Sequence, residues 1–434
     1  MSERPDVVLV AFEGPDRYSF VGGLATRMND LAEALVERGH RVRHVFVGDP
    51  ALPATELRLD GRLLLERWCQ WISAYHPKDV YDGEDGKRAD FSRAVPPHLV
   101  DVVAEGASEG RRTVILFEDW QTADAAVATA ALLGARGLRG AASLFWNANN
   151  TYGFAEIDFP ALDRAVAITT ISRFMRAQMT GIGVDPQIHP NGIAERYLRP
   201  LPPSDARVLR EAFGDRPTFV KVARFDPDKR WLWAIDAIAA LRDIGTRPRL
   251  VMRGSRSDYA TIVGDRIRAR GLSAERVALA AEAPTAKQQA ARASAPSPTR
   301  NLADALAASA ADVVLLDFFV AERTLRALYA AADGVLANSE KEPFGLVGLE
   351  VMASGGIAYV GRTGEDYAVS YGNSVVVQSE DPRELATHLG TLRADAGLTE
   401  RIRADGRATA KRFAWPRIID GLEVAWDAAA RTGL

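Results

Sequence analysis

Two glutamates, Glu342 and Glu350, lie on either side of a predicted helix start in the stretch KEPFGLVGLEVMASGG (341–356). The residues after Gly345 are apolar almost all round, which is typical of a buried helix. Amides of residues 344–347 can point at a phosphate from the helix start, and at 1.5 Å per residue Glu350 lies about 7–8 Å further along. Because carboxylates accept hydrogen bonds from vicinal hydroxyls, we predict a nucleotide diphosphate site with a carboxylate for the ribose and another for a sugar. The alternative is that Glu350 pairs with a buried Arg or Lys.

Two cations, Arg224 and Lys229, follow a predicted strand in PTFVKVARFDPDKR (217–230). A loop of this kind at a strand end suits a diphosphate, although the same spacing is also typical of a solvated charge run. Asp226 and Asp228 form a D-x-D that could hold a metal beside a diphosphate, but the neighbouring cations suggest that side chains supply the positive charge. We predict no metal site, since the six histidines form no H-E-x-x-H pattern.

The N-terminal half offers a weaker set of candidates. Gly22 and Gly23 open the first predicted helix, where a ligand can approach the backbone closely and free N–H groups attract anions; the alternative is an ordinary glycine-rich turn. Residues 66–98 are dense in aromatic side chains, on which sugars stack. The spacing within this segment also predicts a helix face packed inward, formed by Trp68, Trp71 and Tyr75.

The elements that position these residues alternate between strand and helix. Residues 6–48 predict one βαβ unit, and similar alternation continues up to a proline-rich linker at 186–200 and restarts beyond it. Two α/β halves of this style predict doubly wound domains, in which ligands bind beyond the carboxyl ends of the strands. We interpret the low-complexity residues at about 281–310 as a partly disordered surface insertion.

Length and charge narrow the class of protein further. A chain of 434 residues suits two domains. The net charge is −3, and the first 190 residues hold 20 Lys and Arg against 26 Asp and Glu, which argues against a nucleic-acid or anionic-membrane partner there. Apolar runs are strand-length, so no membrane-spanning segment is expected. The single cysteine, Cys69, favours a cytoplasmic location.

Taken together and in order, these motifs resemble the family-4 retaining glycosyltransferases of the GT-B fold. The E-x7-E of Glu342 and Glu350 is similar to the family signature, and RFDPDK is similar to the donor phosphate loop, notably of trehalose-forming synthases. VGGLATRMNDLAEALVERGHRV, TTISRFMRAQM with HPNGI, TLRALYAAADGVLANS and FAWPRI resemble further family segments, and FEDWQTA resembles the glycogen- and starch-synthase branch. The resemblance implies two Rossmann-like domains facing a central cleft.

In this arrangement residues 1–195 would bind the acceptor, with the C-terminal helix at about 415–434 packed back on them, and residues 196–414 would bind the nucleotide sugar. The resemblance implies that Arg224 and Lys229 neutralise the donor diphosphate and that Glu342 contacts the transferred sugar. It assigns the remaining donor contacts to Gly22, Gly23, Phe344, Gly345, Leu346, Val347 and Glu350. Family members usually need no metal or other cofactor, so Asp226 and Asp228 are expected to be structural.

Two positions depart from the family pattern. Asn147 occupies the place where many relatives carry a histidine near the donor sugar, and Asn149 beside it is also polar. Glu118 stands where the synthase branch often shows histidine, so polysaccharide synthesis is not carried over. The acceptor-side candidates are Asn147, Asn149, Asp119 and Tyr81.

The expected function is transfer of a sugar from a nucleotide-diphosphate donor to a small soluble acceptor, with retention of anomeric configuration by same-face substitution. Two alternatives stay open. A glycoside hydrolase or phosphorylase would use the carboxylate pair across one bond, and a non-catalytic module would bind nucleotide sugar without turnover.

Overall fold

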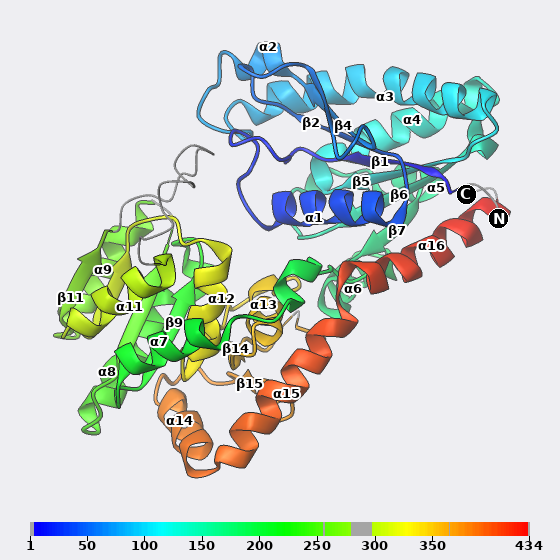
Figure 1. Ribbon diagram of the computed structural model, residues 1–434. Helices are drawn as coiled ribbons and strands as arrows, with labels where there is room; N and C mark the ends of the chain where they lie inside the picture. The colour runs from blue at the N-terminus through cyan, green and yellow to red at the C-terminus, as the bar shows by residue number, and fades with distance from the viewer. Residues whose placement is uncertain (1–3, 255–256, 279–296, 364, 433–434) are drawn as a thin grey trace. The chain divides into compact units, whose positions relative to one another are not determined.

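The computed structural model describes residues 4–254, 257–278, 297–363 and 365–432 (Figure 1). The chain forms two compact units, each an α/β domain. Unit 1 comprises Met1–Ala194 and Phe413–Leu434, and unit 2 comprises Glu195–Arg412.

Unit 1 is built on a sheet which, in the described residues, has eight strands in the order β3-β4-β2-β1-β5-β6-β7-β8. All neighbours pair in parallel except β3 with β4. The strands are β1 Asp6–Val10, β2 Val42–Val47, β3 Thr55–Arg58, β4 Leu63–Trp68, β5 Thr113–Glu118, β6 Ala142–Ala148, β7 Ala167–Thr170 and β8 Gln187–Ile188. The helices are α1 Gly23–Arg38, α2 Gln70–Ser73, α3 Glu84–Ser108, α4 Ala123–Ala135, α5 Phe159–Ala165, α6 Arg173–Thr180 and α16 Trp415–Thr432.

The central strands of unit 1 are apolar runs because helices cover the sheet. Every residue of β5 is buried. Helix α1 buries one apolar face and ends at Gly39, whose φ of 104° is the left-handed conformation that glycine adopts most readily. The C-terminal helix α16 packs against α1 and β6 (Figure 1). It buries Trp415 and Trp426 in the same core.

Unit 2 has, within the described residues, a seven-stranded parallel sheet in the order β11-β12-β10-β9-β13-β14-β15. Its strands are β9 Thr218–Val222, β10 Arg249–Arg253, β11 Ala274–Val277, β12 Val313–Leu316, β13 Gly334–Ala337, β14 Ala358–Val360 and β15 Val375–Val376. Its helices are α7 Pro203–Phe213, α8 Trp231–Asp243, α9 Tyr259–Ala269, α11 Pro298–Ala308, α12 Glu322–Ala331, α13 Leu346–Ala353, α14 Glu384–Ala394 and α15 Ala396–Arg412.

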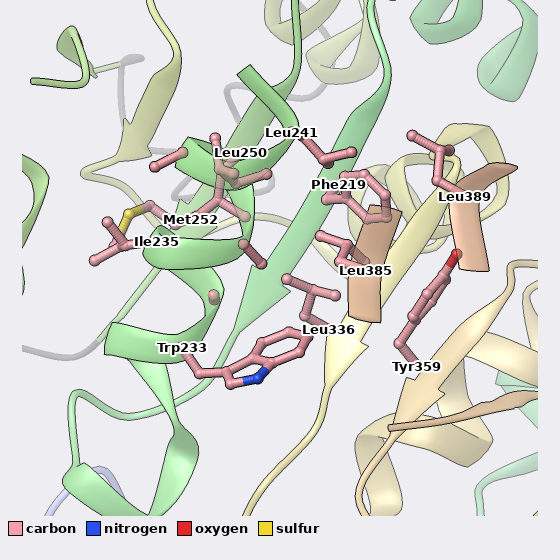
Figure 2. Packing of buried hydrophobic residues seen from close by; sticks show 14 of the residues in the cluster. Phe219, Trp233, Ile235, Leu241, Leu250, Met252, Leu336, Tyr359, Leu385 and Leu389 are labelled. Carbon is pink, nitrogen blue, oxygen red and sulfur yellow. The ribbon is translucent and has the colours of Figure 1, made fainter. Parts of the chain in front are cut away.

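The core of unit 2 lies between its sheet and the helices α8 and α14. Figure 2 shows Leu241 of α8 and Leu385 of α14 beside Phe219 and Leu336 of the central strands, with Ile235 of α8 in the same cluster. All five side chains are buried. This packing holds β9 and β13 rigidly side by side, which matters because both strands lead into the candidate site.

Two expectations from the sequence need correction. The proposed insertion at about 281–310 falls partly on residues 281–296, which lie outside the described residues, but its end is the helix α11, with Leu302 and Leu306 buried. Apolar side chains at helical spacing made that segment part of the core despite its simple composition.

The expectation of an inward-packed helix face near residue 70 is also wrong. Trp68 ends strand β4, whereas Trp71 is 63% exposed and Tyr75 is 81% exposed. The two exposed rings line a hollow of about 390 Å³ together with His76, and the Trp71 indole N–H donates to Asp90 (3.1 Å). The helix α2 spans only four residues, so a regular helical face cannot form there.

None of the helices in the described ranges combines the length and apolar character that crossing a membrane requires.

Candidate functional site

The candidate site in unit 2 lies where the strand order of its sheet changes direction. From β9 the chain first builds strands on one side of the sheet, β10 and β12, and later places β13 on the other. The carboxyl ends of β9 and β13 therefore border the crevice in which open α/β sheets bind ligands. The loops after these two strands are joined, because the Glu340 N–H donates to the Asp228 carbonyl (2.9 Å).

Lys229 and Glu342, which come from these two loops, form an ion pair. The ammonium lies 2.8 Å from a carboxylate oxygen of Glu342, and the two side chains are 22% and 21% exposed. The Glu342 N–H is held by the hydroxyl of Thr363 (3.0 Å). Arg224 is exposed, and within the described residues its guanidinium makes no hydrogen bond or ion pair. Two cations and one carboxylate are thus available to an incoming ligand at one sheet edge.

Gly345 is the N-cap of helix α13 and has a φ of 81°. Its carbonyl accepts a hydrogen bond from the Tyr367 hydroxyl (2.5 Å). The Phe344 side chain is buried, whereas Leu346, Val347 and Glu350 are half-buried. Amides at this helix start can face an anion, and Glu350 is the fifth residue of the helix, which at the ideal rise puts it about 7–8 Å along the helix from Gly345.

Replacing Gly345 with alanine is expected to weaken binding of a nucleotide sugar at least tenfold and to lower stability by about 1–3 kcal/mol. A Cβ there would lie 2.7 Å from Cγ of Glu365, and φ is in the left-handed region. The steric clash and the unfavourable backbone conformation would each displace the start of α13. Calorimetric titration and denaturant unfolding measure the two effects. Gly390→Ala in α14 is the matched control, since its Cβ meets nothing within 4 Å. Equal binding of nucleotide sugar by both variants would contradict a binding site at the start of α13.

The sequence did not draw our attention to Lys221, a lysine in the middle of β9. Its side chain is 1% exposed, and its Nζ donates to the Leu336 carbonyl (2.9 Å) and to Asn338 (2.8 Å). Burial, and then Lys229, lower the pKa of Lys221 well below its usual value. The signal that could have revealed it is a lysine inside the apolar run TFVKV. Lys221 ties β9 to β13, the two strands whose following loops carry Lys229 and Glu342.

Asp226 of the D-x-D motif has a local structural contact. The Asp226 carboxylate caps the short helical turn Pro227–Lys229 by accepting the Asp228 N–H (2.9 Å). Among the described residues no group of three or more His, Cys, Asp or Glu side chains is placed to hold a metal ion.

A second group of candidates lies in unit 1, at the carboxyl ends of β1 and β5. Glu13, three residues beyond β1, accepts the N–H groups of Gly22 and Ala25 (both 3.0 Å) and the hydroxyl of Tyr81 (2.5 Å). The Gly22 amide is therefore not free, in contrast to our expectation, because a carboxylate of the same unit already caps α1. A Cβ at Gly22 or Gly23 would meet nothing within 4 Å, so a ligand has room there. Glu13 was missed because it lies nine residues before Gly22, the N-cap of the helix that it caps.

The two departures from the family pattern, Glu118 and Asn147, form one network. They are register partners at the ends of β5 and β6, and the Asn147 and Asn149 side-chain amides donate to Glu118 (2.9 and 2.6 Å). Glu118 also holds Arg27 of α1 through two hydrogen bonds (3.1 and 3.2 Å) in the interior. Since Asn147 also accepts from Thr169 (3.0 Å), both polar ends of its side chain are used within the fold.

Asp119 occupies a strained position beside this network. Its φ of 62° and ψ of 173° are rare for a residue with a side chain. The carboxylate accepts the Asn149 N–H (2.8 Å) and the Asn150 amide (2.9 Å). Burial raises the pKa of Asp119 to about 7, helped by the charges of Glu118 and Glu13 and opposed by the Asn149 N–H. Such strain and a neutral-range pKa are features of functional sites.

The structure thus brings Arg224, Lys229, Glu342, Gly345 and Glu350 together in unit 2, and Tyr81, Asp119, Asn147 and Asn149 together in unit 1. Their individual roles toward a ligand stay predictions.

Comparisons with known proteins add to this geometry. No protein-family model matches the chain. It is 38% identical over 106 residues to a D-inositol 3-phosphate glycosyltransferase of Xylanimonas cellulosilytica, which is 24% of this chain and 25% of that protein. The chain spans about a quarter of the length of the curated relatives it matches.

Solved structures match over nearly the whole chain. The catalytic domain of starch synthase IV from Arabidopsis thaliana, bound to ADP and acarbose, matches with a TM-score of 0.68 and 16% identity, covering 99% of this chain and 100% of that one. The Anabaena protein HepE in complex with UDP-glucose matches with a TM-score of 0.59 and 16% identity, covering 97% and 99%. The predicted fold class is confirmed. The chain has the GT-B fold, and the resemblance to the GT4-like glycosyltransferases is confirmed as well.

Proposed function

We propose that this protein is a nucleotide-sugar-dependent, anomer-retaining glycosyltransferase that uses unit 2 to bind the donor and unit 1 to bind the acceptor. The observation that carries the proposal is the Lys229–Glu342 pair at the sheet switch point, next to the N-terminus of α13. Support comes from the solved neighbours, one bound to ADP and one to UDP-glucose. Each nucleotide is a diphosphate, which is the group that this site suits.

In the proposed complex the diphosphate lies at the start of α13. Its charge competes with Glu342 for the Lys229 ammonium, whereas the Arg224 guanidinium has no partner to give up among the residues that the structure describes. Neutralising the diphosphate stabilises the charge that develops as the nucleotide leaves. Glu342, once released, accepts hydrogen bonds from hydroxyls of the transferred sugar, and Glu350 accepts those of the ribose. Same-face attack then retains the anomeric configuration.

The acceptor is proposed to be a small soluble molecule bound at the carboxyl ends of β1 and β5. Tyr81 and Asp119 are the residues that we assign to it. Asn147 and Asn149 are proposed to act by holding Glu118, which in turn positions the end of β5 and so the Asp119 backbone.

The proposed cytoplasmic location rests on the single cysteine alone.

The test is a thermal-shift panel with UDP, ADP, GDP and TDP and the corresponding glucose conjugates. A ligand that binds the folded state alone raises the melting temperature according to its occupancy, by about 2.7 kcal/mol of stabilisation at a concentration one hundred times its Kd. We expect one nucleotide series to raise the melting temperature, and Lys229→Ala to reduce that shift at equal ligand concentration without removing it. A wild-type protein that responds to none of these ligands would overturn the proposal.

The same preparations distinguish the other classes of protein. A transferase releases nucleoside diphosphate faster when a suitable acceptor is added. A hydrolase or phosphorylase would cleave glycosides without any nucleotide, and a binding module would show the melting shift with no turnover.

A further inference from the structure

A third carboxyl group, that of Glu365, lies beside the N-terminus of α13 and has no role in the proposal above. Glu365 follows strand β14 by five residues, and its side chain is 8% exposed. Neither of its oxygens has a hydrogen-bond partner in the part of the chain that the structure describes. A Cβ placed on Gly345 would lie 2.7 Å from Cγ of Glu365 and 3.1 Å from one carboxyl oxygen. The carboxyl group is therefore directly against the N-cap of α13.

The charged and titratable groups around Glu365 come from three loops. Glu342 and Lys229 act on it from the loops after β13 and β9, and Tyr367 lies two residues further along its own segment. Burial, and then the negative charge of Glu342, raise the pKa of Glu365 well above its ordinary value of 4.5. The nearby N–H groups of Glu365 and Gly361 and the Lys229 cation act in the opposite direction, but neither N–H group has the geometry of a hydrogen bond to the carboxyl oxygens. Burial is the largest of these effects.

The surroundings of the Glu365 side chain favour its protonated, uncharged form. An ionised, buried carboxylate without a partner is costly, and a nucleotide sugar would bring two further negative charges to the same place. A protonated carboxyl group, by contrast, carries an O–H donor. A phosphate oxygen at the start of α13 would supply the acceptor that the described residues do not.

We propose that Glu365 is a donor-binding residue that stays protonated and donates a hydrogen bond to a phosphate oxygen of the nucleotide sugar. The inference rests on the proposed function and deepens it, because it makes donor binding depend on pH. When Glu365 ionises, the donor hydrogen bond is lost and repulsion replaces it. Affinity for the donor then falls as pH rises.

Donor affinity as a function of pH tests this role. The probe is the glucose conjugate that gives the largest melting shift in the panel, titrated calorimetrically from about pH 5.5 to 8.5, where a nucleotide-sugar diphosphate does not itself titrate. We expect wild-type affinity to fall by up to about tenfold per pH unit above the pKa of Glu365. Glu365→Gln keeps a hydrogen-bond donor without charge, so its affinity for the glucose conjugate should not change with pH over this range. At the lowest pH its affinity should lie within about threefold of that of the wild type.

Glu340→Gln is the matched control. Glu340 is exposed in the loop before Glu342, so this variant makes the same change in net charge without touching the carboxyl at α13. It should follow the wild-type pH profile. Parallel profiles for the wild type and Glu365→Gln would overturn the role of Glu365.

Stability without ligand tests the protonation separately. A group whose pKa is raised by folding contributes stability that is complete below its unfolded pKa and is lost as pH rises through the folded pKa. Glu365→Gln removes this dependence. Its melting temperature should therefore rise relative to the wild type as pH increases from the ordinary value of 4.5. Melting temperatures that stay parallel across the range would show that Glu365 is ionised in the folded protein and would overturn the inference.

The two failures are distinguishable. Absence of any nucleotide-sugar binding by the wild type overturns the proposed function. Binding that is normal in the wild type but equally pH-dependent in Glu365→Gln overturns only the inference about Glu365.

Discussion

Lys229→Ala is expected to lower the turnover of nucleotide sugar by about 10²–10³-fold at saturating donor, the loss typical of removing one preorganised group that stabilises charge in the transition state. The ammonium of Lys229 is held 2.8 Å from Glu342 at the carboxyl ends of β9 and β13. Removing it takes one of two cations from the diphosphate and leaves Glu342 to repel the donor. Release of nucleoside diphosphate with and without acceptor measures the effect.

Lys341→Ala is the matched control for this experiment, because Lys341 is exposed and directly precedes Glu342. It should leave turnover within about twofold of the wild type, as expected for a surface charge. Both variants should melt close to the wild type. If Lys229→Ala and Lys341→Ala turned over alike, Lys229 would not belong to the donor site.

Glu118→Ala is expected to destabilise unit 1 by about 3–5 kcal/mol, because it leaves a buried arginine without its counter-charge. The Glu118 and Arg27 side chains are 1% and 5% exposed. Glu118 also accepts the amides of Asn147 and Asn149, so three donors lose their acceptor at once. Denaturant unfolding followed by tryptophan fluorescence reports the change, since α16 places Trp415 over Arg27.

Glu105→Ala provides the comparison for Glu118→Ala. Glu105 is 60% exposed and lies 3.5 Å from Arg43 on the surface of the same unit. A surface pair of this kind contributes about 0–1 kcal/mol. A loss of stability equal to that of Glu105→Ala would mean that the buried network around Glu118 is not what stabilises this part of the fold.

The strands and helices that carry the donor-side candidates could be predicted because each signal is local. The run TFVKV predicts β9, and Gly345 followed by apolar residues predicts α13. Sequence spacing alone placed Arg224 and Lys229 after one strand and Glu342 after another. That the two loops meet follows from general topology, since the carboxyl ends of parallel strands lie at one edge of the sheet.

Other features could not be predicted, because they depend on pairs of residues far apart in the chain. Glu118 and Asn147 looked like two unrelated departures until the register of β5 and β6 made them neighbours. The capping of α1 by Glu13 depends on the conformation of the loop between β1 and α1, which brings Glu13 to the Gly22 N–H. Exposure of Trp71 and Tyr75 depended on how short α2 is, which spacing alone does not show.

The sequence by itself determined the two α/β halves, the sheet-edge loops and the candidates for donor binding, because hydrophobic periodicity and turn chemistry act between near neighbours. Tertiary structure alone decided which charges are paired, which are buried and which have a shifted pKa. Lys221 and Glu365 show why: nothing local to either residue sets its environment, whereas burial among distant strands and loops shifts the pKa of both.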